Sequence, residues 1–456
     1  MQGELNNTMK LTFDRGTILV GGDIRVPNSS WDDRSKSYRA MALYYKDTID
    51  FLKLSGLDFQ DEVLDLIACP ELQIHSDLIL RDYQKQSLDA WIANDKRGIV
   101  VLPTGSGKTV IGIKAISTLN TPTIVIAPTL DLVDQWRTRL KKEFKVDVGV
   151  LGGGEHEIKA LTVSTYDSAY IHAGNLGNQF GLIIFDEVHH LAAEGYRNIA
   201  EMFASPYRMG LTATLEREDG LHSELTRLVG GKVFEKRVKD LTGTHLSSFR
   251  VEKIAVELTD DEQEEYEKNQ KVFSDYLARI NLTIRSPADF QKLVMRSGRD
   301  PGARRALIAR NKAREIAYNS VSKMGKLSEI LKRHNGGKIF IFTEHNKLVH
   351  RISRQFLIPS ITYRTPGKER SEILDRFRSG IYRAVVTSKV LDEGIDVPDA
   401  DVGIILSGTG SQRAFIQRLG RILRKKEGKE AVLYEIVSSE TSEVNTARRR
   451  KRPLKQ

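Results

Sequence analysis

The fold is decided by Leu102-Pro103-Thr104-Gly105-Ser106-Gly107-Lys108-Thr109, which follows the apolar run Ile99-Val100-Val101 and precedes a helix-like segment, Val110 to Ile116. A strand, a glycine-containing loop and a helix in this order are typical of a phosphate-binding loop. The glycines let backbone N–H groups face a phosphate, and the helix N-terminus adds partial positive charge. Lys108 would reach the β- and γ-phosphates, and Thr109 would hold Mg²⁺. We therefore expect residues 103–109 to bind a nucleoside triphosphate, although Leu102 stands where the general pattern has its first glycine.

An acidic pair follows another apolar run further along the chain. Leu182–Phe185 leads into Asp186-Glu187-Val188-His189-His190, and ligands of open α/β sheets bind at the carboxyl ends of the strands. Asp186 can hold Mg²⁺ through its water shell, whereas Glu187 can orient and partly deprotonate the water that attacks the γ-phosphorus. In isolation such a pair is usually an exposed turn. Its position after the phosphate-binding loop, in the same series of strands, favours phosphoryl-transfer chemistry.

The amino-acid composition and net charge predict a globular protein that binds a polyanion. The 456 residues suffice for two to four domains, and no apolar run approaches the roughly 20 residues that cross a bilayer. We therefore expect no membrane partner and no secretory signal. Cys69 is the single cysteine, which excludes an internal disulfide framework and fits a reducing, intracellular and cytoplasmic setting. The net charge of +10 favours a polyanion such as a nucleic acid.

The order of apolar runs predicts two α/β domains with parallel sheets, separated by a helical insertion and preceded by a small domain. In the small domain, Leu11 to Val20 is expected to form two strands around a turn, and Tyr38 to Leu54 a helix. Alternation of short strands with helices is typical of parallel sheets. The expected strands are Ile99–Leu102, Thr123–Ala127, Leu161–Ser164, Leu182–Phe185 and Met209–Leu211 in the first α/β domain, and Ile339–Phe342, Ala384–Thr387, Val402–Leu406 and Ala431–Ile436 in the second.

The segment between the two α/β domains is charged and has helical periodicity. Thr259 and Glu262 form a capping-box pattern, and apolar residues then recur on one helix face at Tyr266, Phe273, Leu277 and Ile280. Further along, basic residues outnumber the lone acid Asp300, which makes this region a candidate contact for nucleic-acid phosphates or, equally, a solvated helix face. These basic residues are Arg296, Arg299, Arg304, Arg305, Arg310, Lys312 and Arg314.

Two arginines in the second α/β domain have the spacing of catalytic arginine fingers. Arg421 and Arg424 lie three residues apart in Gln417-Arg418-Leu419-Gly420-Arg421-Ile422-Leu423-Arg424, so on a helix they share a face. Two guanidinium groups on one face suit the charge that develops on a transferring phosphoryl group. The alternative is an exposed basic helix that packs or binds DNA. Fingers supplied by a second domain would make hydrolysis depend on closure of the two domains.

Taken in order, the motifs of the chain resemble those of superfamily 2 helicases, and more narrowly those of the XPB helicase family. The Asp-Glu-Val-His box, the triplet Arg217-Glu218-Asp219, the helical insertion and the segment Leu391–Pro398 carry the narrower resemblance. The short N-terminal domain resembles the archaeal members rather than the longer eukaryotic subunits of TFIIH. The motifs are Leu80–Gln84, Leu102–Thr109, Ala127–Leu130, Gln135-Trp136, Val163–Tyr166, Asp186–His189, Leu211–Thr214, Ile341–Thr343 with His345-Asn346, Gly394–Asp396 and Gln417–Arg424.

The resemblance implies two RecA-like motor domains, a thumb-like insertion and a small α+β N-terminal domain. The expected boundaries are 1–76 for a DNA-interaction domain in the place of the family's damage-recognition domain, 77–241 for the ATP-binding motor domain, 242–321 for the thumb, 322–447 for the second motor domain and 448–456 for a basic tail. The N-terminal assignment rests on position, because no base-reading pattern is legible there.

The resemblance also implies roles around the nucleotide. Gln84, with Arg81 beside it, would read the adenine edge, which favours ATP with Mg²⁺ as the cofactors. Gly394 and Asp396 would approach the nucleotide from the second motor domain, and Gln417 would position the attacking water.

Further roles concern the coupling of hydrolysis to motion and the DNA. Thr212 and Thr214 would link hydrolysis to motion, and His189 would couple the acidic box to that link. Arg217, Glu218 and Asp219 would act at the duplex fork, or else form a charged exposed loop. Segments that follow the strands are expected to contact the nucleic-acid backbone without reading its sequence. They lie near Thr129, Thr165, Thr343 and Thr387.

The function expected from these features is ATP-dependent opening of duplex DNA, with 3′–5′ movement by resemblance, in nucleotide excision repair or transcription. An RNA remodeller is one alternative, because none of these residues senses the 2′-OH. The translocating subunit of a restriction system and a non-catalytic platform are the others. The family also suggests a separate nuclease partner. The preferred DNA substrates are single strands and forked duplexes.

Overall fold

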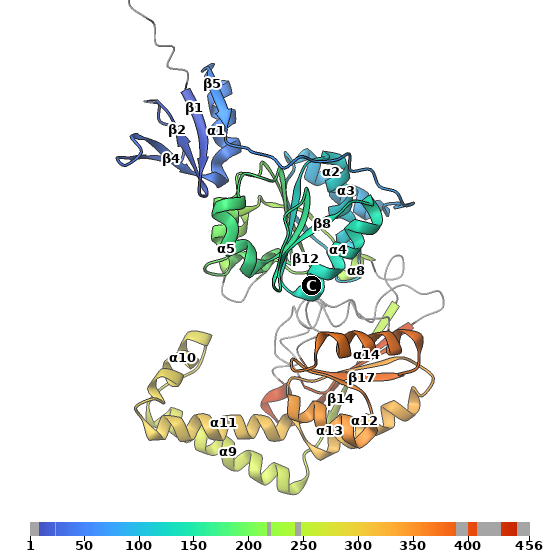
Figure 1. Cartoon of the computed structure of the whole chain (residues 1–456). Helices are drawn as coiled ribbons and strands as arrows, with labels where there is room; N and C mark the ends of the chain where they lie inside the picture. The colour runs from blue at the N-terminus through green and yellow to red at the C-terminus, as the bar shows by residue number, and fades with distance from the viewer. Residues whose placement is uncertain are drawn as a thin grey trace, which may run out of the picture. The chain divides into compact units, whose positions relative to one another are not determined.

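Two parallel sheets dominate the computed structural model, which describes residues 9–22, 24–216, 220–241, 248–388, 400–407 and 430–444. Contacts between Cα atoms divide the described chain into a first unit, which runs up to Asp240, and a second unit, which begins at Leu241. Each unit holds one of the parallel sheets (Figure 1). The first unit also carries a smaller sheet formed by the N-terminal residues.

The N-terminal domain is a five-stranded sheet in the order β3-β4-β2-β1-β5, with a short 3₁₀ helix that leads into an α-helix. The strands β1 and β2 pair antiparallel around the turn at Arg15 and Gly16, which confirms the hairpin predicted between Leu11 and Val20. Its elements are β1 (Met9–Asp14), β2 (Thr17–Val20), β3 (Ser29–Asp32), β4 (Ser37–Met41), η1 (Ala42–Tyr44), α1 (Tyr45–Leu54) and β5 (Phe59–Glu62).

The helix predicted from Tyr38 to Leu54 is wrong in its first part. Residues 37–41 form β4, which pairs antiparallel with both β2 and β3, and α1 begins at Tyr45. Strand pairing on two sides outweighs the local preference of five residues for a helix, because propensity is a weak prior against tertiary contacts. The Tyr38 ring packs edge-on against Trp31 of β3, with 5.3 Å between the ring centroids.

The first α/β domain is built on an eight-stranded sheet in the order β13-β6-β12-β11-β7-β10-β8-β9. All pairs are parallel except β8 with β9. The five predicted strands are present, and β8, β9 and β13 were not predicted. The strands are β6 (Arg97–Val101), β7 (Thr123–Ala127), β8 (Val148–Gly152), β9 (Glu155–His156), β10 (Leu161–Thr165), β11 (Leu182–Asp186), β12 (Tyr207–Thr212) and β13 (Lys232–Glu235).

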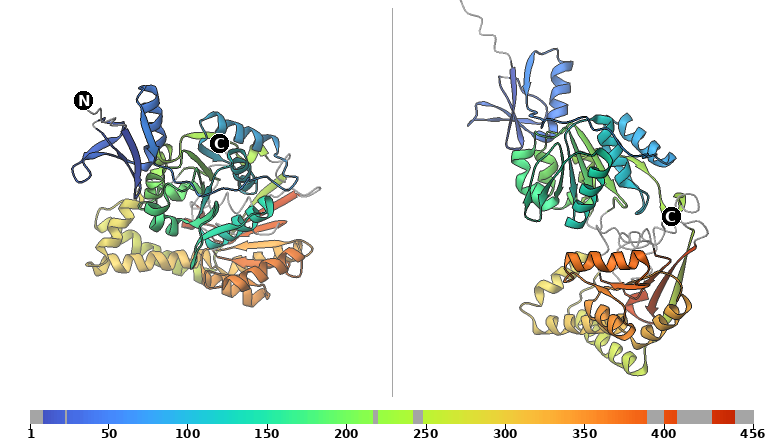
Figure 2. Two further views of the ribbon diagram at one scale, coloured as in Figure 1. Left: turned by 45° about the horizontal axis from the view of Figure 1, so that its top comes forward. Right: turned by 45° about the vertical axis from the view of Figure 1, so that its right-hand side comes forward.

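Helices cover both faces of this sheet, with α5 on one face and α2, α3 and α4 on the other (Figures 1 and 2). Residues of successive strand positions face opposite helix layers, so the sheet is buried on both sides. The helices are α2 (Asp82–Ala93), α3 (Lys108–Leu119), α4 (Leu130–Phe144), α5 (Tyr166–Leu176), η2 (Val188–Ala192), α6 (Arg197–Met202), η3 (Leu221–Ser223), α7 (Glu224–Leu228) and α8 (Val238–Leu241).

The second unit contains a six-stranded parallel sheet in the order β14-β19-β18-β15-β17-β16. The four predicted strands are present. Apolar residues of α12 and α13 form a core cluster with one face of the sheet, whereas Phe377 of α14 packs against Phe340. The elements are β14 (Ser248–Val256), α12 (Val321–Arg333), β15 (Ile339–Phe342), α13 (Asn346–Phe356), β16 (Ser360–Ile361), α14 (Gly367–Ser379), β17 (Ala384–Thr387), β18 (Val402–Ile405) and β19 (Glu430–Ser438).

The segment expected to be a helical insertion begins instead with a strand. Residues 248–256 form β14 at the edge of the second sheet, where they pair in parallel with β19 over nine positions. Ile254 and Val256 alternate toward the core of this unit, as the side chains of a strand must. The prediction failed there because a local pattern rich in charge does not reveal the distant strand β19 that the segment joins.

The remainder of that segment is helical and forms an arm of α9 (Asp260–Arg279), α10 (Pro287–Arg296) and α11 (Pro301–Tyr318) (Figure 1). The predicted capping box is present, since Glu262 N donates to Thr259 Oγ1 and Thr259 N donates to Glu262 Oε2. The predicted apolar face of α9 is confirmed, because Tyr266 packs on α11 and Phe273, Leu277 and Ile280 join a cluster with α10 and α11.

The base of the arm is hydrogen-bonded to the second sheet. Ser438 Oγ at the end of β19 donates to Ala317 O of α11 at 2.7 Å, and Ser442 N donates to Tyr266 Oη of α9 at 2.9 Å. Beside these contacts, Lys323 and Glu443 form an ion pair of 2.6 Å with both side chains fully buried. Lys323 Nζ also donates to Leu406 O at 2.8 Å. The buried pair therefore connects α12, the end of β18 and the C-terminal segment.

We expect Lys323→Met to lower the free energy of unfolding of the second unit by about 3–5 kcal/mol, because it leaves the Glu443 carboxylate buried without its cation. The double change Lys323→Met with Glu443→Leu should recover most of that loss, since well-packed apolar residues replace both charges. Urea denaturation of the full chain measures both. Lys347→Met removes the exposed pair with Glu315 and should cost under about 1 kcal/mol. Equal losses for the single and double variants would contradict this account.

Candidate nucleotide-binding site and nucleic-acid interface

The phosphate-binding loop lies between β6 and α3, at the carboxyl edge of the first sheet. Helix α3 begins at Lys108, and Gly107 precedes it in a left-handed conformation with φ of +83°. Gly105 has φ of +82°, which is also a conformation that favours glycine. A Cβ atom at Gly107 would lie 2.6 Å from Gln84 Nε2. Backbone conformation therefore favours glycine at both positions, and the close Gln84 side chain further favours it at Gly107.

The loop residues fit a polyphosphate with Mg²⁺. Lys108 Nζ donates to Leu102 O at 3.3 Å, and it lies 4.0 Å from Glu187 Oε1, with both side chains about nine-tenths buried. Among the described residues, Thr104 Oγ1 and Ser106 Oγ are buried without a hydrogen-bond partner, so both hydroxyls could donate to phosphate oxygens. Thr109 lies half-buried in the first turn of α3. The described part of the chain holds no group of three or more His, Cys, Asp or Glu that could bind a metal alone, and Mg²⁺ commonly completes its shell with phosphates and water.

Gln84 and Arg81 lie at the start of α2, directly beside this loop. The Gln84 carboxamide accepts from Arg81 N at 2.9 Å and donates to Ser106 O at 2.8 Å, so it joins the helix start to the loop. Tyr83 Oη donates to the same carbonyl at 2.6 Å. A carboxamide has two N–H groups and two lone pairs on its oxygen. These two hydrogen bonds therefore leave one N–H group and one lone pair of the Gln84 carboxamide unused.

Asp186 ends β11 and is held in place by two aromatic side chains. Trp136 Nε1 of α4 donates to Asp186 Oδ2 at 2.8 Å, and Tyr166 Oη of α5 donates to the Asp186 carbonyl at 3.1 Å. Glu187 follows in a left-handed conformation with φ of +46°, which is uncommon outside glycine and turns the chain sharply. The sequence motif contained Trp136, but nothing local revealed that its indole would bind the carboxylate.

Burial raises the pKa of Asp186 to about 6, and the neighbouring Glu187 carboxylate acts in the same direction. The hydrogen bond from Trp136 and the charge of Lys108 oppose this shift. The indole N–H therefore favours the charged form of Asp186, which is the form that could hold Mg²⁺ through water.

The residues expected to couple hydrolysis to motion lie beside Glu187. His189 is fully buried, and its Nδ1 is 3.1 Å from Thr212 Oγ1 and 3.6 Å from Glu187 Oε2. Thr212 Oγ1 lies 3.3 Å from Glu187 Oε2 and 2.8 Å from Thr214 O. One hydroxyl proton can serve only one of these acceptors at a time, so Thr212 has two alternative partners.

Two of the expected backbone-contact residues are helix N-caps at the carboxyl edge of the first sheet. Thr129 caps α4 by accepting from Leu132 N at 3.3 Å, and Thr165 caps α5 by accepting from Ser168 N at 3.2 Å. The preceding strands β7 and β10 are neighbours in the sheet. Two adjacent helix N-termini therefore face the same edge, and such termini bind phosphates.

The corresponding residues of the second sheet are buried. Thr343 Oγ1 lies 2.8 Å from Ser407 Oγ, and Thr387 Oγ1 donates to Ser388 O at 2.9 Å. Neither side chain is exposed. Their hydroxyl groups therefore stabilise the strand ends, and contact of a nucleic-acid backbone with the segments near them stays a prediction.

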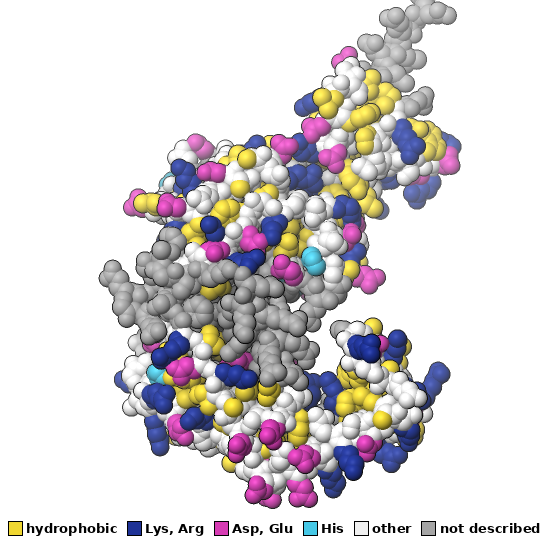
Figure 3. Space-filling model, turned by 180° about the vertical axis from the view of Figure 1, so that it is seen from behind, with side chains coloured by type: hydrophobic (Ala, Val, Ile, Leu, Met, Phe, Trp, Pro, Cys, Tyr) yellow, Lys and Arg dark blue, Asp and Glu magenta, His cyan; other side chains and the backbone are white. Residues whose placement is uncertain are grey.

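Some basic residues of the arm form ion pairs or lie over aromatic rings, whereas others are exposed. Arg296 pairs with Asp300, Lys312 pairs with Glu265, and Arg310 lies over the rings of Phe273 and Phe290. Arg304 and Arg305 are exposed on α11. Basic side chains gather toward the tip of the arm, and the acidic residues of the start of α9 lie at its base (Figure 3).

Several expected residues lie outside the described part of the chain. These are the triplet Arg217, Glu218 and Asp219, the second-domain residues Gly394 and Asp396, the arginine-finger group Gln417, Arg421 and Arg424, and the tail 448–456.

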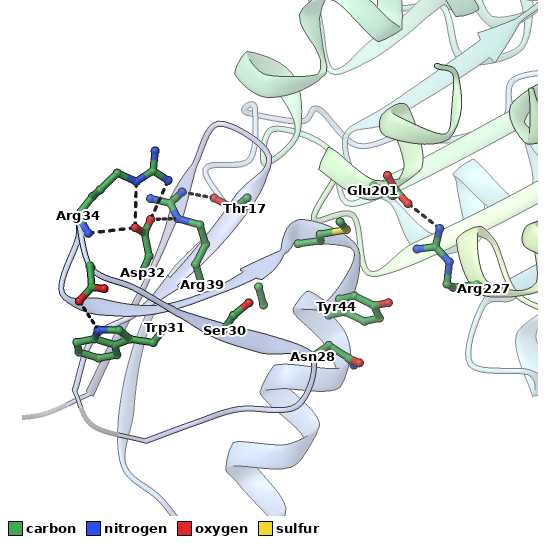
Figure 4. A pocket seen from close by; sticks show the side chains of 13 residues that line it. Thr17, Asn28, Ser30, Trp31, Asp32, Arg34, Arg39, Tyr44, Glu201 and Arg227 are labelled. Carbon is green, nitrogen blue, oxygen red and sulfur yellow. Dashed lines mark hydrogen bonds and ion pairs between the residues drawn. The ribbon is translucent and has the colours of Figure 1, made fainter. Parts of the chain in front are cut away.

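A hollow of about 760 Å³ opens between the N-terminal sheet and the first α/β domain (Figure 4). Asp32 accepts hydrogen bonds from Arg34 and Arg39, and the bonds from Arg34 are the main cause that lowers the pKa of Asp32 to about 2. Positive and negative side chains of its lining balance, so the hollow has no field that selects a polyanion. They are Arg34, Arg39 and Arg227 against Asp32, Asp33 and Glu201.

Comparison with known families divides the chain into three matched regions. Residues 11–63 match the damage recognition domain of the xeroderma pigmentosum group B helicase, residues 77–217 match the res subunit of type III restriction enzymes, and residues 322–426 match the helicase conserved C-terminal domain. A Sulfurisphaera tokodaii protein described as DNA 3′–5′ translocase XPB2 is 45% identical over 441 residues, which are 97% of this chain and 99% of that protein. The chain belongs to the XPB family.

Other relatives carry additional sequence beyond the matched part. The putative DNA 3′–5′ helicase Rad25 of Halobacterium salinarum is 30% identical over 86% of this chain, which spans 59% of that protein. The general transcription and DNA repair factor IIH helicase/translocase subunit of Saccharomyces cerevisiae is 29% identical over 87% of this chain and 46% of its own length. The helicase domain of Pyrococcus furiosus Hef has the same fold, with a TM-score of 0.54 at 21% identity over 82% of this chain and 99% of that domain. The predicted family and fold class are confirmed.

In the described residues of this XPB-family protein, no helix has both the length and the apolar character needed to cross a bilayer.

We expect Trp136→Phe to move the acidic limb of ATP hydrolysis to higher pH. Removal of the indole N–H leaves burial and Glu187 in place, so the pKa of Asp186 rises further above 6 and the charged form is lost at a higher pH. The profile of kcat/KM between about pH 5 and 8 measures this, because it reports the pKa of groups in the free enzyme.

The control is Trp91→Phe, which removes another buried indole donor, bonded to Arg208 O, away from the acidic pair. Its acidic limb should match that of the wild type. An unmoved limb in Trp136→Phe would contradict the role given to the indole.

Proposed function

We propose that this protein is an ATP-dependent DNA 3′–5′ translocase that opens duplex DNA in nucleotide excision repair or transcription. The main support is that Lys108 and Glu187 lie together at one edge of the first sheet, with 4.0 Å between Nζ and Oε1. A cation for phosphate and a carboxylate for water at this distance suit hydrolysis of a nucleoside triphosphate. The near-complete match to a relative named a DNA 3′–5′ translocase supports the choice of DNA and direction.

The proposed roles at the nucleotide follow from this geometry. Lys108 and the backbone N–H groups of residues 103–107 hold the phosphates, whereas Thr109 and Asp186 hold Mg²⁺, Asp186 through water. Glu187 orients the attacking water, and Gln84 with Arg81 beside it reads adenine. Hydrolysis of the phosphoanhydride bond between the β- and γ-phosphates of ATP, bound with Mg²⁺, provides the free energy for movement.

We assign the second half of the nucleotide site to the second motor domain. Gly394 and Asp396 approach the nucleotide, Gln417 helps to position the water, and Arg421 with Arg424 neutralises charge on the transferring group. An arginine finger of this kind typically raises the rate constant of phosphoryl transfer about 10³- to 10⁵-fold. Contacts from both domains make the closed arrangement dependent on bound ATP, so hydrolysis favours opening. Thr212, with its alternative partners Glu187 and Thr214, and His189 would transmit this change.

The proposed DNA track includes, in the first unit, the N-termini of α4 and α5 next to Thr129 and Thr165. In the second unit it includes the strand ends near Thr343 and Thr387 and the exposed Arg304 and Arg305 of the arm. These groups contact phosphates, which carry no sequence information. We therefore expect weak sequence preference and affinity that falls steeply with salt. A flat salt response would count against the track.

The domain organisation and partners complete the proposal. Residues 1–76 form a DNA-interaction domain, and 77–241 and 322–447 form the motor, to whose second sheet β14 also belongs. The arm in the remainder of 242–321 forms the thumb, and 448–456 form a basic tail. Action on DNA places the protein inside the cell, and a separate nuclease is its proposed partner. The restriction-type alternative has one supporting observation, the match of residues 77–217, but the XPB-type match covers nearly the whole chain.

We expect Lys108→Ala to abolish DNA-stimulated ATP hydrolysis, because the cation that holds the β- and γ-phosphates is lost. Turnover should be stimulated more by single-stranded DNA than by RNA of matched length. A coupled phosphate-release assay measures both. Lys114→Ala, on the same helix α3 but beyond its first turns, is the matched control and should retain activity. Stimulation by RNA alone would favour the RNA remodeller. ATP hydrolysis that persists in Lys108→Ala would contradict the assignment of Lys108 to the nucleotide-binding site.

We expect Arg217→Ala to lose strand displacement on forked DNA while it keeps DNA-stimulated ATP hydrolysis. The triplet 217–219 is assigned to the duplex fork rather than to the nucleotide, so separation of strands and hydrolysis should respond differently. Displacement of a labelled strand and phosphate release, measured on the same preparation, test this. Equal loss of both activities would assign Arg217 to the motor instead.

A further inference from the structure

We propose that Tyr363, supported by Arg364, is a stacking platform for an unpaired base of the DNA strand that the motor grips. This rests on the proposed DNA translocase function and adds a base contact to the phosphate contacts of the track. It concerns a short turn between β16 and α14, which none of the motifs includes.

The turn that carries Tyr363 is held by its own hydrogen bonds. Thr365 N donates to Thr362 O at 3.0 Å, and Thr362 N donates to Thr365 Oγ1 at 2.9 Å. Arg364 N donates to Thr362 Oγ1 at 3.3 Å. Residues 362–365 therefore form a closed turn that holds the side chain at position 363 outward without support from a core.

The aromatic ring is exposed, and a guanidinium group lies beside its hydroxyl end. Tyr363 has 61% of its surface exposed. The Arg364 guanidinium carbon lies 5.4 Å from the ring centroid, and Arg364 Nε donates to Tyr363 Oη at 2.9 Å. An aromatic ring beside an arginine suits a nucleobase, because every base offers a π-face that can stack on the ring.

The position of the turn matches the edge at which the strand is proposed to run. Ile361 of β16 pairs with Thr387 of β17, and Ser388 N donates to Ile361 O at 3.2 Å. Thr343 N donates in turn to Thr387 O at 3.0 Å. The ends of β15, β17 and β16 therefore lie in a row at the carboxyl edge of the second sheet (Figure 1).

The side chains along this row differ in exposure. Thr343 and Thr387 are buried, whereas Tyr363 and Arg364 at its end are exposed. Helix α14 begins at Gly367, immediately after the turn, and Lys368 in its first turn is exposed. A base on Tyr363 would thus have a cation and a helix N-terminus nearby for its phosphate.

The same sheet provides a matched pair at its opposite edge. Arg376 lies over the Tyr382 ring at 5.7 Å, and its Nη1 donates to Tyr382 Oη at 3.2 Å. Tyr382 comes just before β17, so it lies at the amino edge, away from the proposed strand. The two tyrosine–arginine pairs have similar chemistry but lie at opposite edges of the sheet. A substitution at Tyr382 therefore shows what loss of an aromatic ring does away from the proposed DNA strand.

The test uses the full chain and a fluorescently labelled single-stranded oligonucleotide, with affinity measured by anisotropy. Tyr363→Ala should weaken binding about 5- to 140-fold, the range of one lost base stack. Tyr363→Phe keeps the ring and should bind within about twofold of the wild type, and Tyr382→Ala should bind as the wild type does. Thermal unfolding checks that each variant is folded, which is expected for a change at an exposed ring.

A second strand of equal length, with an abasic site at every position, separates stacking from charge. On this strand the wild type and Tyr363→Ala should bind equally, because only phosphates remain. Wild-type affinity in Tyr363→Ala, or an equal loss on both strands, would overturn the platform while the translocase function stands. Failure of the wild-type chain to bind either strand would overturn the translocase function and the platform together.

Discussion

Parallel pairing of β6, β12 and β11 is the constraint on which the candidate site depends. Thr212 pairs with Val101, and Asp186 pairs with Leu211, so the three strands end at the same level of the sheet. Leu102 N donates to Thr212 O at 2.9 Å and extends this alignment into the phosphate-binding loop. A shift of one residue would point each side chain to the other face. Lys108, the two carboxylates and Thr212 are therefore brought together by strand register rather than by proximity in sequence.

The Asp186 carboxylate is stabilised by one partner that is far away in the sequence and by one that is adjacent to it. Asp186 is only 6% exposed, and a carboxylate at such a depth is costly without hydrogen bonds. Trp136 supplies one from α4, and Glu187 N supplies another at 3.0 Å. Burial nevertheless dominates, since the pKa of Asp186 stays above its ordinary value. The site thus holds a carboxylate that gains from a nearby cation, which is the property a magnesium-binding group needs.

The parts that the sequence predicted are those with strong local signals. The phosphate-binding loop requires glycines at fixed positions, and the apolar strands of both sheets are uninterrupted, so both were predicted correctly. β8 was missed because Gly149 and Gly152 interrupt its apolar run. β14 was missed because its charged residues, Arg250, Glu252 and Lys253, hide the alternation of apolar and polar side chains that is typical of a strand. Both became strands through pairing with β10 and β19. The contact of Trp136 with Asp186 joins residues 50 positions apart, and no local pattern encodes it.

The arm and the second sheet form one mechanical body in the proposed motor. Ser438 and Ser442 bind α11 and α9 at the base of the arm, and the buried pair of Lys323 and Glu443 fixes the segment that carries them. Arginines on the arm and Tyr363 at the sheet edge would therefore move together when the second unit moves. The helix starts at Thr129 and Thr165 belong to the first unit. Directional movement along a strand requires two grips that alternate in strength, and contacts divided between two bodies meet that requirement, whereas contacts confined to one body would only hold the strand in place.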